Sequence, residues 1–212
     1  MHLNRAYLIR AVAVGVVCVV SVGACSPSPD PGRRGAESPG APQLVEPEGE
    51  LSTLEPVEGV GGEVVTVVDG LSLILPEGTV REDRSEGGAQ QERMAYRMPD
   101  ADSEGVPVIQ VTYFPRAGGA GAESSMSDWR MQQNPAVSDY VRSPARWPGA
   151  GEAYVESWTQ EIATSDGSLV VDCLSLWVDT PNGLTAVVLA MALHGELEGS
   201  TALTALRTLR GG

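Results

Sequence analysis

The sequence predicts an α+β domain: an antiparallel sheet of about six strands with helices packed on its faces. Runs rich in Val, Leu and Ile are joined by turn pairs that favour tight hairpins. The last segment instead repeats leucine at helical spacing, at Leu203, Leu206 and Leu209. Both patterns begin after residue 62, so a single domain is expected over residues 63–212. The turn pairs are Asp69-Gly70, Asp166-Gly167 and Asn182-Gly183.

The first half of this domain is expected to hold a hairpin, two further strands and a helix. The helix is expected over Ser124–Gln133, where Ser125 and Asp128 fit a weak capping box. Residues Val137–Ala150 contain two prolines and are expected to form a loop, with one short strand near Tyr140–Arg142. The expected strands are Val64–Val68, Leu71–Leu75, Arg93–Met98 and Val106–Phe114.

Three strands and a closing helix are expected in the second half. Leu184–Leu193 is apolar on both faces, which predicts a central strand covered on both sides. The run could also form a helix segment, but its valines and the preceding Asn-Gly pair favour a strand. The final helix is expected over Ser200–Arg210, with Ser200 as its N-cap. The other two strands are expected over Glu152–Ala163 and Leu169–Asp179.

Residues 1–24 have the features of a lipoprotein signal peptide. Arg5 and Arg10 precede an apolar run, Ala11–Val20, that is shorter than the roughly 20 residues of a membrane span. The residues that follow, Val22-Gly23-Ala24-Cys25, resemble the bacterial lipobox. We therefore expect cleavage between Ala24 and Cys25, and attachment of a diacylglycerol to the Cys25 thiol. A plain secretory signal with an incidental cysteine, or a retained membrane anchor, are the alternatives.

Residues 25–62 are expected to form the lipidated cysteine and a disordered linker. The stretch is rich in Pro, Gly and Glu, has no aromatic residue and shows no helix or strand period. Such a composition cannot bury enough surface to offset its chain entropy. The alternative is a recognition segment, because apolar islands stand among the acids. These islands are Leu44-Val45, Leu51 and Leu54.

The excess of acidic residues limits the kinds of partner that the protein is expected to bind. The chain of 212 residues has 28 acidic and 14 basic residues, and every basic residue is arginine. Cleavage before Cys25 removes two arginines and no acid, which leaves a net charge of −16. This balance excludes nucleic acid and a polybasic membrane patch as partners. We expect a lipid-anchored protein on the extracytoplasmic face of the cell membrane.

A family resemblance rests on Gly70–Gly78, GLSLILPEG. This run resembles the opening of the LpqN/LpqT-type actinobacterial lipoproteins: an apolar strand, then Pro, an acidic or small residue, and Gly. The order of elements is similar over about residues 64–210. The resemblance implies a Mog1/PsbP-like fold and a small binding or partner-docking domain on the cell envelope, and it supplies no catalytic motif. Thr79 stands where the family often has an aromatic residue.

No catalytic set is evident, so no enzyme, cofactor or metal site is predicted. The alternative is a cell-wall or ester hydrolase that uses His194, although no spacing selects its nucleophile and the chain has no lysine. His194 with Glu196 and Glu198 could bind a metal, but structural zinc sites use several Cys and His, so a loop histidine is favoured. Asp100–Gly105 is similar to part of a calcium loop but lacks the remaining ligands.

The remaining candidates are a cysteine and the tryptophans. Cys173 lies in an alternating run and is expected to be a buried, unreactive side chain. Trp147, with Arg142 and Arg146, is the one basic and aromatic spot of an acidic chain and a candidate for docking a partner. The alternative is that Trp147 covers the sheet. The domain is thus expected to bind a protein partner or an apolar ligand without catalysis. Trp129, Trp158 and Trp177 are expected to share or line the core.

Overall fold

The computed structural model describes residues 50–58, 60–68, 70–82, 92–114, 118–164 and 167–211. The predicted signal peptide, the cleavage site at Ala24 and Cys25, and the lipidation of Cys25 lie outside these residues. Neither α-helix in the described part of the chain has the length and hydrophobicity needed to span a bilayer.

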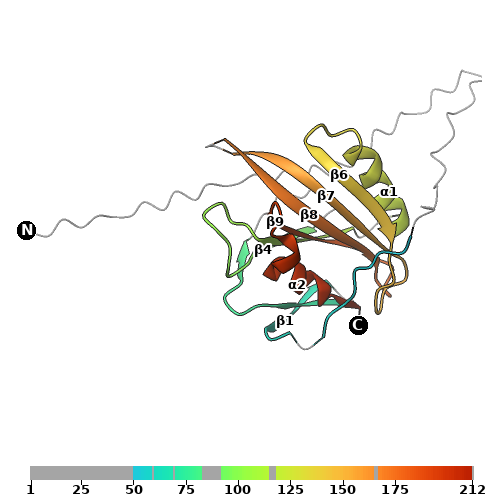
Figure 1. The fold of residues 1–212 in the computed structure, drawn as a ribbon. Helices are drawn as coiled ribbons and strands as arrows, with labels where there is room; N and C mark the ends of the chain where they lie inside the picture. The colour runs from blue at the N-terminus through green and yellow to red at the C-terminus, as the bar shows by residue number, and fades with distance from the viewer. Residues whose placement is uncertain are drawn as a thin grey trace, which may run out of the picture.

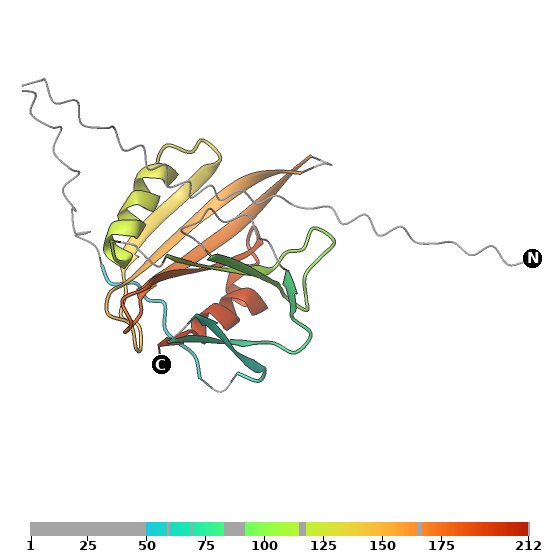
Figure 2. The same cartoon turned by 180° about the vertical axis from the view of Figure 1, so that it is seen from behind.

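Two antiparallel sheets form the body of the domain (Figures 1 and 2). A sheet of seven strands has the order β3-β4-β5-β9-β8-β7-β6, and a sheet of three strands has the order β1-β2-β10. The predicted antiparallel sheet is therefore present, but about six strands was too few. The large sheet comprises β3 (Val80–Glu82), β4 (Glu92–Arg97), β5 (Val108–Phe114), β6 (Val137–Pro144), β7 (Ala153–Thr164), β8 (Gly167–Asp179) and β9 (Thr185–Leu193), and the small sheet comprises β1 (Glu63–Val68), β2 (Leu71–Leu75) and β10 (Arg210–Gly211).

The helices lie on opposite faces of the large sheet (Figures 1 and 2). Helix α2 (Thr201–Arg207) follows a single 3₁₀ turn, Leu197–Gly199, and packs with the small sheet against one face. Helix α1 (Ala120–Met131) lies on the other face, over β6, β7 and β8. These faces are called the α2 face and the α1 face below.

The main core lies on the α2 face. Apolar residues of the small sheet and of α2 meet the inward residues of β5, β8 and β9 there. Strand β9 pairs with β5 on one side and β8 on the other, and it is buried on both faces, which confirms the predicted central strand. Ser200 caps α2 as predicted, because its Oγ accepts the N–H of Leu203 at 3.1 Å.

Helix α1 begins four residues earlier than predicted. Its first N–H group, that of Ala120, donates to Oδ1 of Asp179 at 2.8 Å, so the cap comes from the end of β8. The predicted capping pair, Ser125 and Asp128, lies inside the helix. Gly119, with φ of +101°, supplies the backbone conformation that a residue with a side chain adopts only under strain.

Strand β6 was predicted as a loop with one short strand, but it is an eight-residue edge strand. Its pairing with β7 slips between Ser138 and Val141, and Asp139 has φ of +53°. This bulge inserts one extra residue, and so it turns Tyr140 onto the α1 face, where its ring meets that of Trp158. The bulge interrupts the alternation of apolar and polar residues along the strand, and so the sequence pattern does not reveal it.

The folded domain also begins earlier than residue 63. Residues 50–58, called the strap below, lie against the domain, although the linker was predicted to continue to residue 62. The N–H of Ser52 donates to the carbonyl of Pro144 at 2.9 Å, and the Nε of Arg207 donates to the carbonyl of Glu55 at 2.8 Å. Leu54 packs against the main core. The apolar islands at Leu51 and Leu54 are therefore part of the domain.

Candidate functional site

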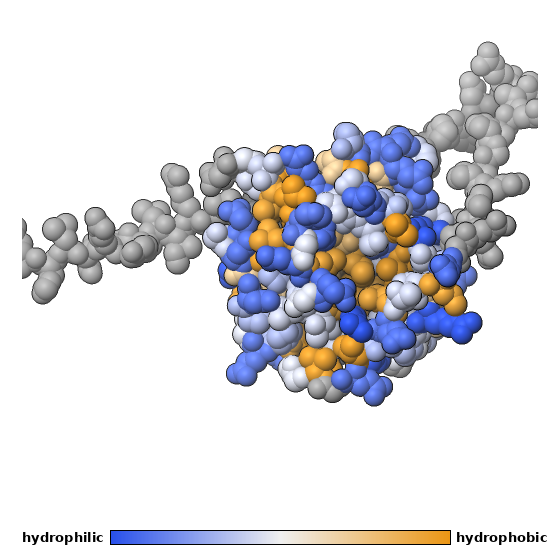
Figure 3. Space-filling model, in the orientation of Figure 1, coloured by the Kyte–Doolittle hydropathy of each residue, from blue (hydrophilic) through white to orange (hydrophobic). Residues whose placement is uncertain are grey.

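The α2 face of the large sheet is left open over β6, β7 and β8, because α2 covers only the part nearer β5 and β9 (Figure 1). Val141 and Val170 stand on it with 56% and 42% of their surface exposed. Apolar surface gathers near the middle of this side of the molecule, between polar rims (Figure 3). We call this surface the open face; it comprises Val141, Ser157, Thr159, Val170, Asp172 and Leu174.

A groove of about 430 Å³ runs along one margin of the open face. The strap forms one wall, where Leu51 is 48% exposed. Val155 and Leu174 form the floor, and Leu203 of α2 contributes to the opposite wall. The groove thus combines aliphatic side chains with the hydroxyls of Ser143 and Ser157. Charged side chains also line it, those of Glu50, Glu55, Glu198 and Arg207.

A second groove, of about 760 Å³, lies between the small sheet and the edge of the large one. It is lined by the ends of β1 and β2, by the turn Pro76–Thr79 and by Arg81 and Tyr96. Glu63 and Glu77 also line it. We favour the smaller groove as the candidate site, because it adjoins exposed apolar side chains and a polar pair described next.

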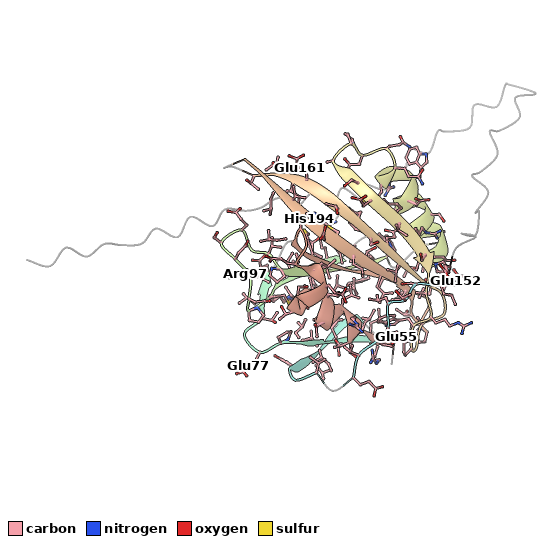
Figure 4. All side chains as sticks on the ribbon, viewed as in Figure 1. Glu55, Glu77, Arg97, Glu152, Glu161 and His194 are labelled. Atoms are coloured by element: carbon pink, nitrogen blue, oxygen red, sulfur yellow. The ribbon has the colours of Figure 1, made fainter. Side chains whose placement is uncertain are left out.

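Asp172 and His194 form a pair at the far end of the open face (Figure 4). Nδ1 of His194 lies 2.7 Å from Oδ1 of Asp172, and this carboxylate also accepts the hydroxyl of Thr159 and the N–H of Gly195. Partial burial raises the pKa of Asp172, but the hydrogen bonds outweigh it and hold that pKa below its ordinary value. The carboxylate therefore fixes the imidazole by one nitrogen.

The surroundings of the His194 imidazole limit the chemistry that this pair can perform. The side chain of His194 is 64% exposed, so its second nitrogen is free to meet a ligand from solvent. Among the described residues, no serine or cysteine side chain is hydrogen-bonded to that imidazole. The described residues also form no group of three side chains that could hold a metal ion, so His194, Glu196 and Glu198 do not converge. Asp102 in the calcium-like run accepts the backbone N–H groups of Glu104 and Val106 and so builds a turn.

The structure does not bring the predicted docking residues together. Trp147 is buried, with only 6% of its surface exposed, and its indole N–H donates to the carbonyl of Leu209, so it cannot be the exposed contact. Arg142 lies on the α1 face, where it bonds to Ser124 and stacks on the ring of Tyr154 at 4.3 Å. Arg146 is exposed. Trp147 covers the core, as the alternative interpretation held.

Two other predictions about side chains are decided by burial. Cys173 is buried, as predicted. Trp129, expected in the core, is instead the most exposed tryptophan, with 65% of its surface exposed on the outer side of α1. Trp158 and Trp177 are buried on the α1 face, as predicted.

The α1 face holds a buried acid that was not singled out from the sequence. Glu156 of β7 has 1% of its surface exposed, and its Oε2 accepts the hydroxyls of Ser127 and Ser175 at 2.9 and 3.2 Å. The N–H of Trp177 and the O–H of Tyr140 act on the same carboxyl, but neither completes a well-aligned hydrogen bond to Oε1 among the described residues. Burial raises the pKa of Glu156 to about 7, although these donors oppose the shift. The alternation of side chains along β7 puts Glu156 on the α1 face, but the residues that cover it are known only from the tertiary structure.

The fold and the open face define an antiparallel α+β domain with exposed aliphatic side chains on one face of its large sheet. No family model matches the sequence, and no curated protein sequence matches it. Among solved structures, the chain is similar to LpqN, a protein involved in cell envelope biogenesis of Mycobacterium tuberculosis. The identity is 13% and the TM-score is 0.45, over 73% of this chain and 88% of that chain. A TM-score below 0.5 does not define a shared fold, so function is argued below from the residues alone.

Proposed function

We propose that this chain is a lipoprotein of the bacterial cell envelope, anchored in the cell membrane through Cys25, whose extracytoplasmic domain binds a protein partner without catalysis. The open face carries this proposal, because the exposed Val141 lines the groove and the exposed Val170 stands on the same face of the sheet beyond it. Apolar side chains exposed together at the centre of a polar surface are typical of interaction sites.

A protein partner fits this surface better than a small apolar ligand. Small-molecule sites enclose most of the ligand in a cleft or cavity. Both grooves lie open at the surface, and charged and hydroxyl side chains stand among the aliphatic ones that line them. The net charge of −16 favours a partner whose apolar patch is rimmed by Arg and Lys, so the association should weaken as salt is raised.

A hydrolase that uses His194 is the second candidate, and the Asp172–His194 pair favours it. A carboxylate that fixes one imidazole nitrogen leaves the other available as a general base. Assays with ester and glycoside substrates would decide between the two. Turnover by the full chain that is abolished by His194→Ala would establish the hydrolase and reject the binding function.

Site-specific photocrosslinking in intact cells tests the binding function. A photoreactive residue is placed at Val141 or Val170, and Val64, which is 67% exposed on β1, serves as the control position. We expect one shared protein adduct from the first two positions, lost when Val170→Arg is added to the Val141 probe, and no such adduct from position 64. Identical adducts from all three positions, or no adduct from 141 and 170, would reject the open face as the site.

The anchor has its own test. Cys25→Ser should abolish incorporation of a labelled fatty acid and release the protein from the membrane fraction, while Cys173→Ser should change neither. Membrane association that survives Cys25→Ser without fatty-acid labelling would contradict the proposed lipid anchor and leave the binding site unaffected.

A further inference from the structure

Helix α1 is docked on the sheet by polar contacts. The residues that it buries are only Ala120, Ser124 and Ser127. Of its larger apolar side chains, Met126 and Trp129 are 43% and 65% exposed on the outer side, and only Met131 is partly buried, against the cluster that contains Trp158. Because apolar burial supplies most of the free energy that holds a helix in place, α1 belongs to the weakly held part of the fold.

The polar contacts converge on one carboxyl group. Ser127 of α1 and Ser175 of β8 both donate to Oε2 of Glu156, so this oxygen links the helix to the sheet. A second link runs from the guanidinium of Arg142 to the hydroxyl of Ser124, at 2.7 Å, and to the carbonyl of Gly121, at 3.3 Å. Besides the cap that Asp179 gives to its first residue, the helix is thus held by a buried acid and by an arginine that are not paired with each other.

The groups around Glu156 determine whether its carboxyl is protonated or ionised while α1 covers it. Strand β6 contributes Tyr140 and Arg142, α1 contributes Asp128, and β8 contributes only the uncharged Ser175 and Trp177. Burial raises the pKa of the Tyr140 phenol well above its ordinary value, so it remains protonated. The guanidinium of Arg142 is committed to α1 and to the ring of Tyr154. Among the described residues, no cation neutralises the Glu156 carboxylate.

We propose that α1 is a pH-responsive cover: loss of the Glu156 proton to water loosens α1 from β7 and β8 and uncovers the aromatic layer beneath it. That layer contains Phe114 and Trp177, stacked with ring centroids 5.9 Å apart, and the ring of Tyr154 beside them. Helix α1 and Glu156 lie on the face opposite the open face. This inference therefore goes beyond the proposed function and does not depend on it.

The size of the effect follows from proton linkage. Closed α1 keeps Glu156 protonated up to a pKa of about 7, and opening restores the ordinary value near 4.5. The opening equilibrium therefore rises about tenfold per pH unit between these two values, and by roughly 300-fold in total. Above neutral pH it becomes constant.

Hydrogen exchange of the full chain, measured by mass spectrometry from pH 5 to pH 8, tests the proposal. After correction for the intrinsic rate, amide protection in α1 should fall about a hundredfold over this range, and at every pH it should stay well below the protection of β9, because α1 opens without global unfolding. Glu156→Gln should remove the excess pH dependence, and Glu161→Gln, an exposed acid on the same strand, should retain it. Parallel curves for the wild-type chain and Glu156→Gln, or equal protection of α1 and β9, would overturn the proposal.

A second variant keeps the test decisive if Glu156→Gln perturbs folding. Ser127→Ala removes the helix-side donor and should raise α1 opening at pH 5 about fivefold. The pH dependence should persist, because the acid remains buried under the helix. Unchanged α1 protection in Ser127→Ala would show that the Glu156 carboxyl does not hold the helix.

Discussion

The indole N–H of Trp147 donates a hydrogen bond to the carbonyl oxygen of Leu209, 2.9 Å away. This contact ties the turn between β6 and β7 to the residue that links α2 to β10. Both residues are buried in the main core, with 6% and 0% of their surface exposed. The chain terminus is therefore secured by a side chain 62 positions away.

Trp147→Phe should lower the free energy of unfolding by about 1 kcal/mol, because the ring is kept and one buried hydrogen bond is lost. Trp147→Ala should cost about 3–5 kcal/mol, since a cavity is also formed. Urea denaturation followed by circular dichroism measures both. Trp129→Phe, at the exposed position on α1, should change stability by less than about 0.5 kcal/mol. Equal effects at the two positions would refute the buried role of Trp147.

Removal of the strap should destabilise the domain. A chain that starts at residue 63 lacks the Ser52 and Val57 contacts with Pro144 and Arg207, and it leaves the guanidinium groups of Arg207 and Arg210 without the strap carbonyls they bind. With four hydrogen bonds and the packing of Leu54 lost, we expect a loss of about 3 kcal/mol relative to a chain that starts at residue 50. Thermal unfolding of the two chains provides the comparison. Equal midpoints would place the domain boundary at 63 after all.

Asp179→Ala should destabilise α1 more than the rest of the domain. The carboxylate accepts the N–H of Ala120 and the hydroxyl of Thr185, so its removal leaves the start of α1 without a cap. A loss of about 1–2 kcal/mol is expected for a helix cap of this kind. Asp179→Asn keeps one acceptor oxygen and should lose less. Proteolysis between α1 and β6 under native conditions would report the difference, and identical rates in the three chains would contradict it.

Stability should fall as pH rises through the range in which Glu156 titrates. The pKa of Glu156 is about 7 in the folded chain and near 4.5 when unfolded, so the folded state holds this proton more tightly. Its contribution is complete below about pH 4.5 and is lost as pH passes 7, a change of about 3 kcal/mol. Urea titrations of the wild-type chain and of Glu156→Gln at pH 5 and pH 8 measure it. The variant should lack this component, and an equal pH dependence in both chains would disprove the assignment.

Local signals explain the parts of the fold that were predicted from sequence. Ser200 and the stripe of leucines predict α2, and the run that is apolar on both faces predicts β9. These signals can be recognised from the sequence because a helix cap and a hydrophobic period each involve residues close together in the chain. Helix α1 was misplaced at its start because its cap, Asp179, lies 59 residues away in the chain. Strand β6 was largely missed because the bulge at Asp139 interrupts its alternation.

The candidate site was predicted less well than the fold. His194 was noticed as a residue type, but its partner Asp172 comes from the neighbouring strand and follows only from the β8–β9 register. Trp147 was a candidate for docking because prolines and arginines surround it in sequence, whereas its indole packs under the chain terminus, as the interpretation that it covers the sheet held. Val141 and Val170 have no distinguishing local signal, because exposure of an aliphatic side chain depends on where α2 ends.

The irregular edge of the large sheet has a consequence for copies of this domain that meet at high concentration. A straight outer strand would offer its free N–H and C=O groups to the same strand of a neighbouring copy, and sheets could then grow from molecule to molecule. In β6 the kink at Asp139 and the closing Pro144, which has no N–H, break that row of groups. The outer strand is thus a poor template for edge-to-edge pairing between neighbouring copies.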